Sequence, residues 1–179
     1  MNKRVLTTRR LCRTGIIAAL YVALTYAFMP FAFGPVQVRP AEALCILPLF
    51  FPEAIFALCI GCALSNLVSP FLFYDVFIGS FTTLAAAVCT FFIGKIIKKD
   101  SLKILIGGIF PVLFNAIVIP FLIVFLYEGG ANADGVLIAY FSSFFSIFLS
   151  QAVWVYALGT PLYFCVKKFQ KNGVRFFTS

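Results

Sequence analysis

The chain has 179 residues, of which 63% are hydrophobic, whereas an ordinary soluble domain has roughly 45–50%. Charged residues make up only 11%, which is too few to cover the surface of a water-soluble fold of this size. The composition therefore excludes a cytosolic enzyme, a secreted disulfide module and a disordered regulator. It predicts an integral membrane protein of the all-α class.

The basic residues, which give the chain a net charge of +8, are grouped in three clusters. The clusters are Lys3, Arg4, Arg9, Arg10 and Arg13, then Lys95, Lys98, Lys99 and Lys103, and finally Lys167, Lys168, Lys171 and Arg175. Lysine and arginine concentrate in the cytoplasmic segments of membrane proteins. Separated clusters therefore indicate topology rather than nucleic-acid binding, and Arg39 is the one basic residue outside them.

In chain order, five charge-free intervals are long enough to predict membrane-spanning helices. They are 14–38, 54–74, 76–94, 104–127 and 135–166. Each has at least 19 residues, close to the roughly 20 that a helix needs to cross the hydrocarbon. A sixth interval, 43–52, has only ten residues, and its interpretation decides the topology.

Parity settles the role of the short interval. If the first two basic clusters are both cytoplasmic, an even number of crossings separates them. An even number requires 43–52 to cross as well, so we predict a short helix over 41–51. Pro52 then begins the next helix at its favoured first position, with Glu53 in the first turn beside the positive end of the helix dipole.

We therefore predict one transmembrane domain over 1–179, a multi-pass protein of the cell membrane with six helices and both termini in the cytoplasm. The helices are expected at about 14–31, 41–51, 52–70, 75–95, 104–127 and 136–166. The basic and then apolar N-terminus resembles a signal peptide. Its removal would leave five crossings and break the charge pattern, so we expect it to be retained.

Three amide side chains are predicted to lie in the middle to outer half of the bilayer. With about 1.5 Å of rise per residue, Asn66 lies roughly 21 Å from the inner surface, Asn115 roughly 18 Å and Gln151 roughly 24 Å. Trp154 lies one turn lower than Gln151. The hydrocarbon core is about 30 Å thick, so these polar groups share one range of depth.

Arg39, Glu42 and Asp75 are expected at or just below the outer surface, and the inner half has almost no uncompensated polar side chain. This distribution predicts a polar cavity that opens outward above an apolar floor.

Other interpretations of these residues stay open. The amides could be interhelical hydrogen bonds worth about 0.6 kcal/mol each, Glu42 and Asp75 could be solvated helix ends, and Arg39 could simply pair with Glu42. Trp154 could be a stacking platform, ordinary packing or part of an interfacial belt.

A stripe of small residues recurs every fourth position on the first predicted helix. Its members are Gly15, Ala19, Ala23 and Ala27. Residues at this spacing share one helix face, and small side chains there let another helix approach closely. The stripe could pack within the protein's own bundle or dock a separate membrane subunit.

Several sequence features argue against an enzyme. The chain has no histidine, no Walker-type phosphate loop and no set of residues for nucleophilic or metal-assisted hydrolysis. We therefore expect neither catalysis nor a cofactor.

The sequence also bears on how transport would be energised. No carboxylate is predicted deep in the bilayer, which argues against proton coupling. Six helices without an inverted repeat make a poor stand-alone transporter, so a binding subunit energised by a partner fits better.

Over about residues 15–166 the chain resembles the QueT family. The resemblance is carried by FGPVQVR at 33–39, EAL at 42–44, PLFFPEAI at 48–55, GCALSNLVSP at 61–70, DVFIGS at 75–80, PVLFNA at 111–116 and YALGTPL at 156–162. It implies a six-helix substrate-binding (S) component of an energy-coupling factor (ECF) transporter, which imports queuosine precursors such as 7-deazaguanines. A transmembrane coupling protein and two cytoplasmic ATPases would be its partners.

The resemblance also implies roles for particular residues. Ala19, Ala23 and Ala27 would dock the coupling protein, and the loop after the first helix would cover an outward-facing site. Taking depth and the resemblance together, we predict seven ligand contacts: Arg39, Glu42, Asn66, Asp75, Asn115, Gln151 and Trp154. Among these, Asn115 and Gln151 would hydrogen-bond a ring, and Trp154 would stack on it.

The chain departs from the family in the sixth predicted helix. Where the family usually has a Gly-Glu pair, this chain has Ser150 and Gln151. A glutamine offers one carbonyl and two donors but no charge, so a changed ligand preference is plausible. Two functions are alternatives to a queuosine-precursor S component. One is an S component for another vitamin or nucleobase, because fold does not determine ligand, and the other is a membrane scaffold protein without transport.

Overall fold

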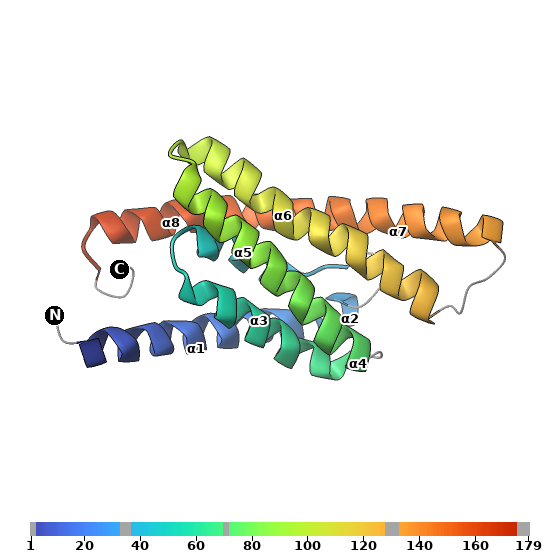
Figure 1. The fold of residues 1–179 in the computed structure, drawn as a ribbon, viewed down its shortest axis with the longest axis horizontal. Helices are drawn as coiled ribbons and strands as arrows, with labels where there is room; N and C mark the ends of the chain where they lie inside the picture. Colours follow the sequence, from blue (N-terminus) through green and yellow to red (C-terminus); the bar gives the residue numbers. More distant parts are fainter. Residues whose placement is uncertain (1–2, 33–36, 70–71, 128–132, 175–179) are drawn as a thin grey trace.

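The computed structural model describes residues 3–32, 37–69, 72–127 and 133–174, and every regular element in these ranges is helical (Figure 1). The predicted all-α class is thereby confirmed for the described residues. The α-helices are α1 (Lys3–Ala27), α2 (Met29–Ala32), α3 (Glu53–Ser65), α4 (Leu72–Tyr74), α5 (Ser80–Ile96), α6 (Asp100–Phe121), α7 (Ala133–Val153) and α8 (Gly159–Lys171). Two 3₁₀ helices, η1 (Pro40–Leu49) and η2 (Asn66–Val68), and three π-helical segments, η3 (Asp75–Gly79), η4 (Leu122–Tyr127) and η5 (Trp154–Leu158), complete the chain.

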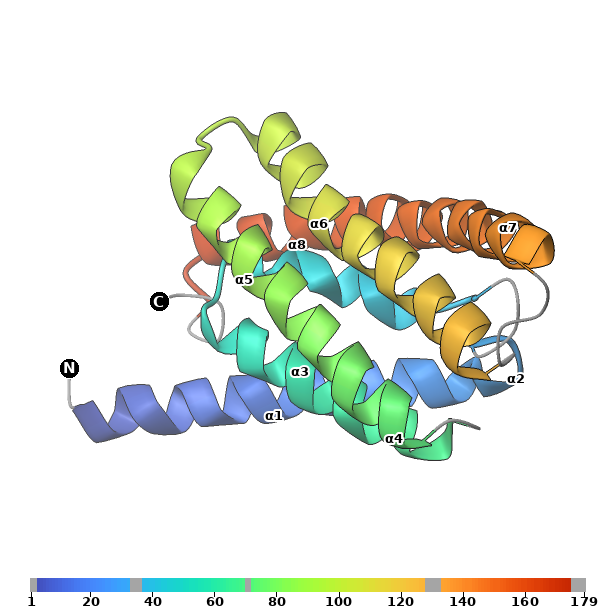
Figure 2. The ribbon, with the colours of Figure 1, turned by 45° about the vertical axis from the view of Figure 1, so that its right-hand side comes forward.

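The elements run back and forth along the long axis of the molecule (Figures 1 and 2). The start of α1, the end of α8 and the α5–α6 connection lie at one end, which we call the basic end because described residues of all three basic clusters belong to these segments. α2, α4 and the start of α7 lie at the other end, here called the opposite end. Segregated charge at one end and apolar helices between is the pattern of a membrane protein.

Among the described residues, three helices are long and apolar enough to cross a membrane: Asp75–Ile96, Asp100–Phe125 and Gly135–Lys171. Two further apolar helices, Pro40–Leu49 and Glu53–Val68, are shorter. The structure thus supports a multi-pass helical protein, whereas six crossings and cytoplasmic termini remain predictions. The first helix begins at Lys3, well before the predicted residue 14, so its charged segment is helical too.

The short element predicted over 41–51 is the 3₁₀ helix η1, and all ten of its residues are buried. It contacts α1, α5, α6 and α8, and a helix that is apolar on every side is expected to be buried in this way. A 3₁₀ helix rises about 2.0 Å per residue, so ten residues extend roughly 20 Å, compared with roughly 15 Å in an α-helix. The tighter winding lets a short segment reach further through the bundle.

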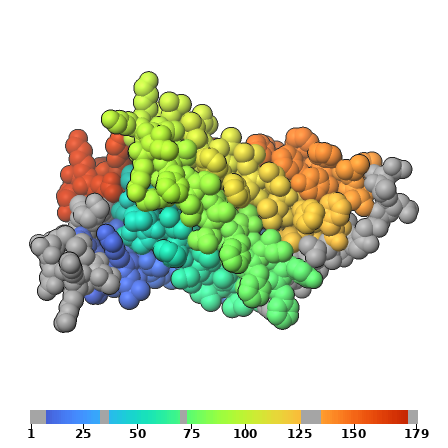
Figure 3. All heavy atoms as spheres, in the orientation of Figure 1, coloured from blue at the N-terminus to red at the C-terminus, as the bar shows by residue number. Residues whose placement is uncertain are grey.

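The main apolar core joins α1, η1 and α3. Its buried members include Ile17, Tyr21, Leu44, Leu47, Phe51, Leu58 and Cys62. On the other side of η1, α5 comes into backbone contact, because a Cβ at Gly94 would lie only 2.8 Å from the Leu49 carbonyl oxygen. α5 and α6 cross the middle of the face shown in Figure 3, and both helices contact η1.

Two groups of polar contacts tie helices together near the basic end. Arg13 of α1 forms a buried salt bridge to Glu53 of α3, with 2.5 Å between Nη1 and Oε1. Asp100, at the start of α6, accepts hydrogen bonds from the Tyr163 hydroxyl at 2.7 Å and from Lys167, both on α8. The first pair joins the N-terminal helices, and the second joins the C-terminal ones.

The small-residue stripe on α1 is exposed. Its members are Gly15, Ala19, Ala23 and Ala27. The neighbouring Ala18 and Tyr21 are buried instead, and they meet α3 at Gly61. α1 therefore packs into the bundle through a different face and leaves the stripe uncovered within the described chain.

Candidate ligand-binding site

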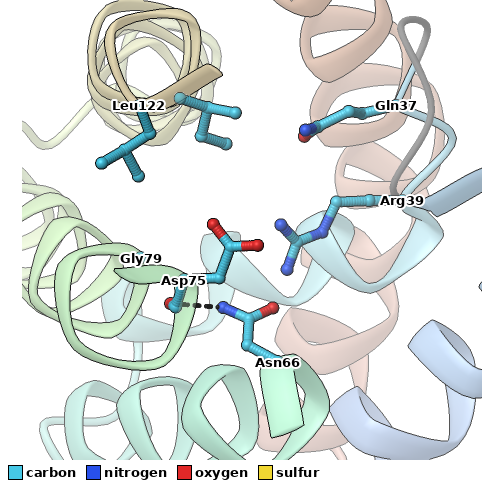
Figure 4. Close-up of a pocket in the computed structure, with 7 residues that line it drawn as sticks. Gln37, Arg39, Asn66, Asp75, Gly79 and Leu122 are labelled. Atoms are coloured by element: carbon cyan, nitrogen blue, oxygen red, sulfur yellow. Dashed lines mark hydrogen bonds between the residues drawn. The ribbon is translucent and has the colours of Figure 1, made fainter. Parts of the chain in front are cut away.

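A cleft at the opposite end gathers polar side chains from elements far apart in the sequence (Figure 4). It is lined by Gln37, Arg39, Asn66, Asp75, Gly79, Ile119 and Leu122. It encloses about 290 Å³ of atom-free space, part of which is open to the outside. The space that the centre of a water molecule can occupy in the cleft is only about 20 Å³, enough for about one water molecule, so a ligand of nucleobase size requires the lining side chains to move apart.

Arg39 is held in the cleft by a buried polar triad. Its Nε lies 3.5 Å from Oε1 of Glu42, one turn into η1, and its Nη2 donates a hydrogen bond to the Tyr21 hydroxyl at 3.2 Å. That hydroxyl donates to Oε1 of Glu42 at 2.8 Å. All three residues are buried: Arg39 is 5% exposed, Glu42 1% and Tyr21 0%. A buried charge is tolerated when it is paired and hydrogen-bonded in this way.

Asn66 is positioned by its place at the end of α3 and by the start of η3. Its Nδ2 donates a 2.8 Å hydrogen bond to the backbone carbonyl of Asp75, which leaves the Oδ1 acceptor for the cleft. A Cβ at Gly79 would lie 2.9 Å from this Nδ2. The absence of a side chain at Gly79 therefore allows the amide of Asn66 to lie where it does.

The Asp75 carboxylate extends into the cleft and faces the guanidinium of Arg39 (Figure 4). The Ser69 hydroxyl donates a hydrogen bond to its Oδ2, which orients the carboxylate from below. Asp75 opens the π-helical segment η3, and such local widenings of a helix are frequent at functional sites.

Several buried polar atoms at the cleft have no hydrogen-bond partner within the described residues. They are Oε1 of Gln37, Nε of Arg39 and Oδ1 of Asn66. A buried polar group without a hydrogen bond costs about 1–3 kcal/mol. Nε of Arg39 is still paired electrostatically with Glu42 at 3.5 Å, whereas the two acceptors, Oε1 of Gln37 and Oδ1 of Asn66, could each accept a hydrogen bond from a polar ligand.

The structure brings Arg39, Asn66 and Asp75 together in one cleft and places Glu42 directly beside Arg39. Glu42 was expected near the outer surface, but it is buried because Tyr21 donates to its carboxylate and Arg39 lies against it. Arg39 pairs with Glu42 as expected. Arg39 also lines the cleft.

The other candidate residues do not line the cleft. Asn115 is buried and precedes the lining residue Ile119 by one turn of α6, so it lies on the same helix face but further from the opposite end. Gln151 is fully buried, and neither polar atom of its amide has a partner among the described residues. It follows Ser150, whose hydroxyl donates to the Gln37 carbonyl, so it lies next to the segment that carries Gln37.

Trp154 lies away from the cleft and opens η5. It is half-buried, with its ring centroid 6.4 Å from that of Phe28 near the end of α1. The structure shows an aromatic packing contact there.

Sequence reasoning missed Gln37, Tyr21 and Gly79. A signal existed for Gln37, because it precedes Arg39 by two residues in a non-helical stretch, where alternate side chains point the same way. The roles of Tyr21 and Gly79 depend on contacts with distant segments. The residues 33–36 of the expected covering loop lie outside the described residues.

Apolar helices of membrane-spanning length, charge gathered at one end and a small polar cleft at the other together define a helical membrane protein with a polar cleft at one end. The family model of the QueT transporter matches residues 11–168. The chain therefore belongs to the QueT transporter family and is a multi-pass protein of the cell membrane.

Comparison with curated proteins finds the queuosine precursor transporter QueT of Lactococcus lactis subsp. cremoris (strain MG1363), which is 41% identical over 72 residues. The aligned segment covers 39% of this chain and 42% of that relative. No solved structure matches the chain.

Proposed function

We propose that the protein is the membrane-embedded substrate-binding subunit of an ECF-type importer and that it captures a queuosine precursor of the 7-deazaguanine class. The observation that carries the proposal is one cleft that holds the buried acceptors of Gln37 and Asn66, which have no hydrogen bond among the described residues, beside the guanidinium of Arg39. Membership of a transporter family and the printed name of the Lactococcus relative support it.

The proposed ligand matches the polar atoms of the cleft. A deazaguanine ring presents N–H donors and a carbonyl acceptor along its edges. The side-chain carbonyls of Gln37 and Asn66 can accept from the donors, and the guanidinium of Arg39 can donate to the carbonyl. In this proposal Asn115, Gln151 and Trp154 contact the ligand only if it extends beyond the residues that line the cleft.

We further propose that the basic end faces the cytoplasm, with six crossings and the cleft open to the outside. The positive-inside rule supports this orientation, since the cleft lies at the end opposite the basic clusters. A coupling membrane protein and two cytoplasmic ATPases would supply the energy. The exposed stripe at Ala19, Ala23 and Ala27 supports a helix-docking surface, because small residues allow close helix approach.

A direct binding experiment tests the ligand proposal. Purified protein in detergent is titrated calorimetrically with 7-deazaguanines, with guanine, and with unrelated vitamins such as riboflavin and thiamine. We expect saturable binding of at least one 7-deazaguanine and none of the vitamins. Binding of a vitamin without any 7-deazaguanine would overturn the assignment of the substrate class.

A glycine pair localises that binding to the cleft. Gly79→Ala places a Cβ 2.9 Å from Nδ2 of Asn66, which forces the amide to shift, so we expect affinity to fall by about tenfold. Gly135→Ala is the matched control, because a Cβ there meets nothing within 4 Å, and its affinity should equal that of the unmodified protein. Equal affinity of both variants would show that the ligand binds elsewhere.

A further inference from the structure

We propose that two of the basic clusters form a single surface that binds the phosphate group of a negatively charged phospholipid. We call it the lysine surface, and it consists of Lys98 and Lys99 in the α5–α6 connection and Lys168 and Lys171 on α8. The inference concerns a partner other than the transported substrate, and it holds whichever substrate the cleft binds.

The first step is that the fold joins two basic clusters that are far apart in the sequence. Asp100, the first residue of α6, accepts hydrogen bonds from the Tyr163 hydroxyl at 2.7 Å and from Lys167, both on α8. α8 therefore lies beside the α5–α6 connection at the basic end (Figures 1 and 2). Each member of the lysine surface is within four residues of Asp100 or Lys167 along the chain, so the two pairs of lysines flank one contact.

The second step is the charge of this surface. All four lysines are exposed, and no salt bridge within the described residues involves them. The carboxylate of Asp100 is already engaged by Lys167. The other described carboxylate near the basic end, that of Glu53, is engaged by Arg13. The lysine surface therefore has a positive charge that a phosphodiester group can complement.

The third step is the apolar surface beside the lysines, which favours a lipid over a soluble anion. Ile96 at the end of α5 is 73% exposed, and Phe164 on α8 is 52% exposed. One helix of membrane-spanning length, Asp75–Ile96, ends beside the lysine surface, and the next, Asp100–Phe125, begins there. The lysines thus lie where the hydrocarbon meets the head groups, so a phospholipid can place its phosphate on the lysines and its acyl chains on the apolar side chains.

The experiment compares two lipids that differ in charge and share their acyl chains. Native mass spectrometry of the purified full-length protein in a neutral detergent measures binding of dioleoyl phosphatidylglycerol, which has one negative charge, and of dioleoyl phosphatidylcholine, which has no net charge. We expect phosphatidylglycerol to bind about tenfold more tightly or better, because several lysines attract its phosphate and nothing in its head group offsets that charge.

Paired substitutions localise the preference to the lysine surface. Lys98→Gln combined with Lys168→Gln removes one charge from each cluster and should reduce the preference to less than about threefold. Lys98→Arg combined with Lys168→Arg keeps the charges and should keep the preference, which guards against a folding defect. The matched control is Arg9→Gln combined with Arg10→Gln on α1, which removes two charges outside the lysine surface and should leave the preference unchanged.

Three results would overturn the inference. The first is equal binding of the two lipids by the unmodified protein. The second is an unchanged preference in the double glutamine variant of the lysine surface. The third is a glutamine variant that keeps its lipid preference but no longer co-purifies with the cytoplasmic ATPases, which would assign the lysine surface to an acidic protein partner. Failure to bind any 7-deazaguanine would count against the proposed function and would leave this inference standing.

Discussion

Two buried ion pairs show how single residues hold this protein in its fold. Arg13 pairs with Glu53 near the basic end, and Arg39 pairs with Glu42 beside the cleft. Burying a charge is expensive unless a partner and hydrogen bonds compensate it. The partners explain why charged side chains with so little exposure are tolerated in an apolar bundle.

The pair near the basic end gives a stability prediction. Glu53→Gln leaves the buried guanidinium of Arg13 without its counter-charge, so we expect a loss of roughly 3–5 kcal/mol in the free energy of unfolding. Thermal unfolding of the purified protein in detergent measures the change.

The control for this prediction is the double substitution Arg13→Met and Glu53→Met. Replacing both members of a buried pair by apolar side chains is often close to neutral, so the double variant should be more stable than Glu53→Gln. If Glu53→Gln unfolds at the same temperature as the unmodified protein, the salt bridge contributes no stability.

At the scale of elements, departures from regular α-helix gather near the cleft. The π-helical segments η3 and η4 supply Asp75 and Leu122 to its lining. η4 begins two residues after Pro120, whose missing N–H and ring interrupt the preceding turn. The π-helical turns therefore place side chains from long helices in the cleft, while the regular α-helical segments pack against one another.

The exposed face of α1 gives a prediction about assembly. We expect Ala23→Trp to prevent co-purification with the coupling protein and ATPases, because a large side chain blocks the close helix approach that small residues permit. A pull-down after co-expression of all subunits measures this. Phe81→Trp, at a 68% exposed position on α5, is the control and should assemble normally. Equal recovery of both variants would place the docking surface elsewhere.

At the scale of the whole molecule, charge and polarity are divided between the two ends. The basic clusters belong to one end, and the cleft lies at the other (Figures 1 and 2). The apolar core of α1, η1 and α3 and the backbone contact of α5 with η1 fill the space between them. Such a molecule has an orientation in the membrane that can be measured.

Thiol labelling measures that orientation. Cys12 is exposed at the basic end, so we expect a membrane-impermeant maleimide to modify it in inside-out vesicles and not in intact cells. Gly135 is exposed at the start of α7, at the opposite end. A variant that combines Cys12→Ser with Gly135→Cys should be labelled in intact cells. Labelling of Cys12 from outside would overturn the proposed topology.

Much of the fold could be predicted because the relevant signals are local. Long apolar intervals and the clusters of lysine and arginine predicted an all-helical membrane protein, and the helices of Asp75–Ile96, Asp100–Phe125 and Gly135–Lys171 are long enough to span a bilayer. The 3₁₀ form of η1 was not predicted, and in the structure η1 packs against α1, α3, α5, α6, α8 and η5, most of which come from distant parts of the chain.

The candidate site was predicted only in part, because depth along a helix does not reveal which way a side chain faces. Depth placed Asn115 and Gln151 among the ligand contacts, yet neither lines the cleft. The meeting of Arg39, Asn66 and Asp75 depends on how three segments rotate and pack, and on the space that Gly79 leaves.

The sequence by itself determined the membrane class, because apolar length and segregated charge act locally. Only the tertiary structure decided which polar groups share a cleft, because that choice requires contacts between distant segments.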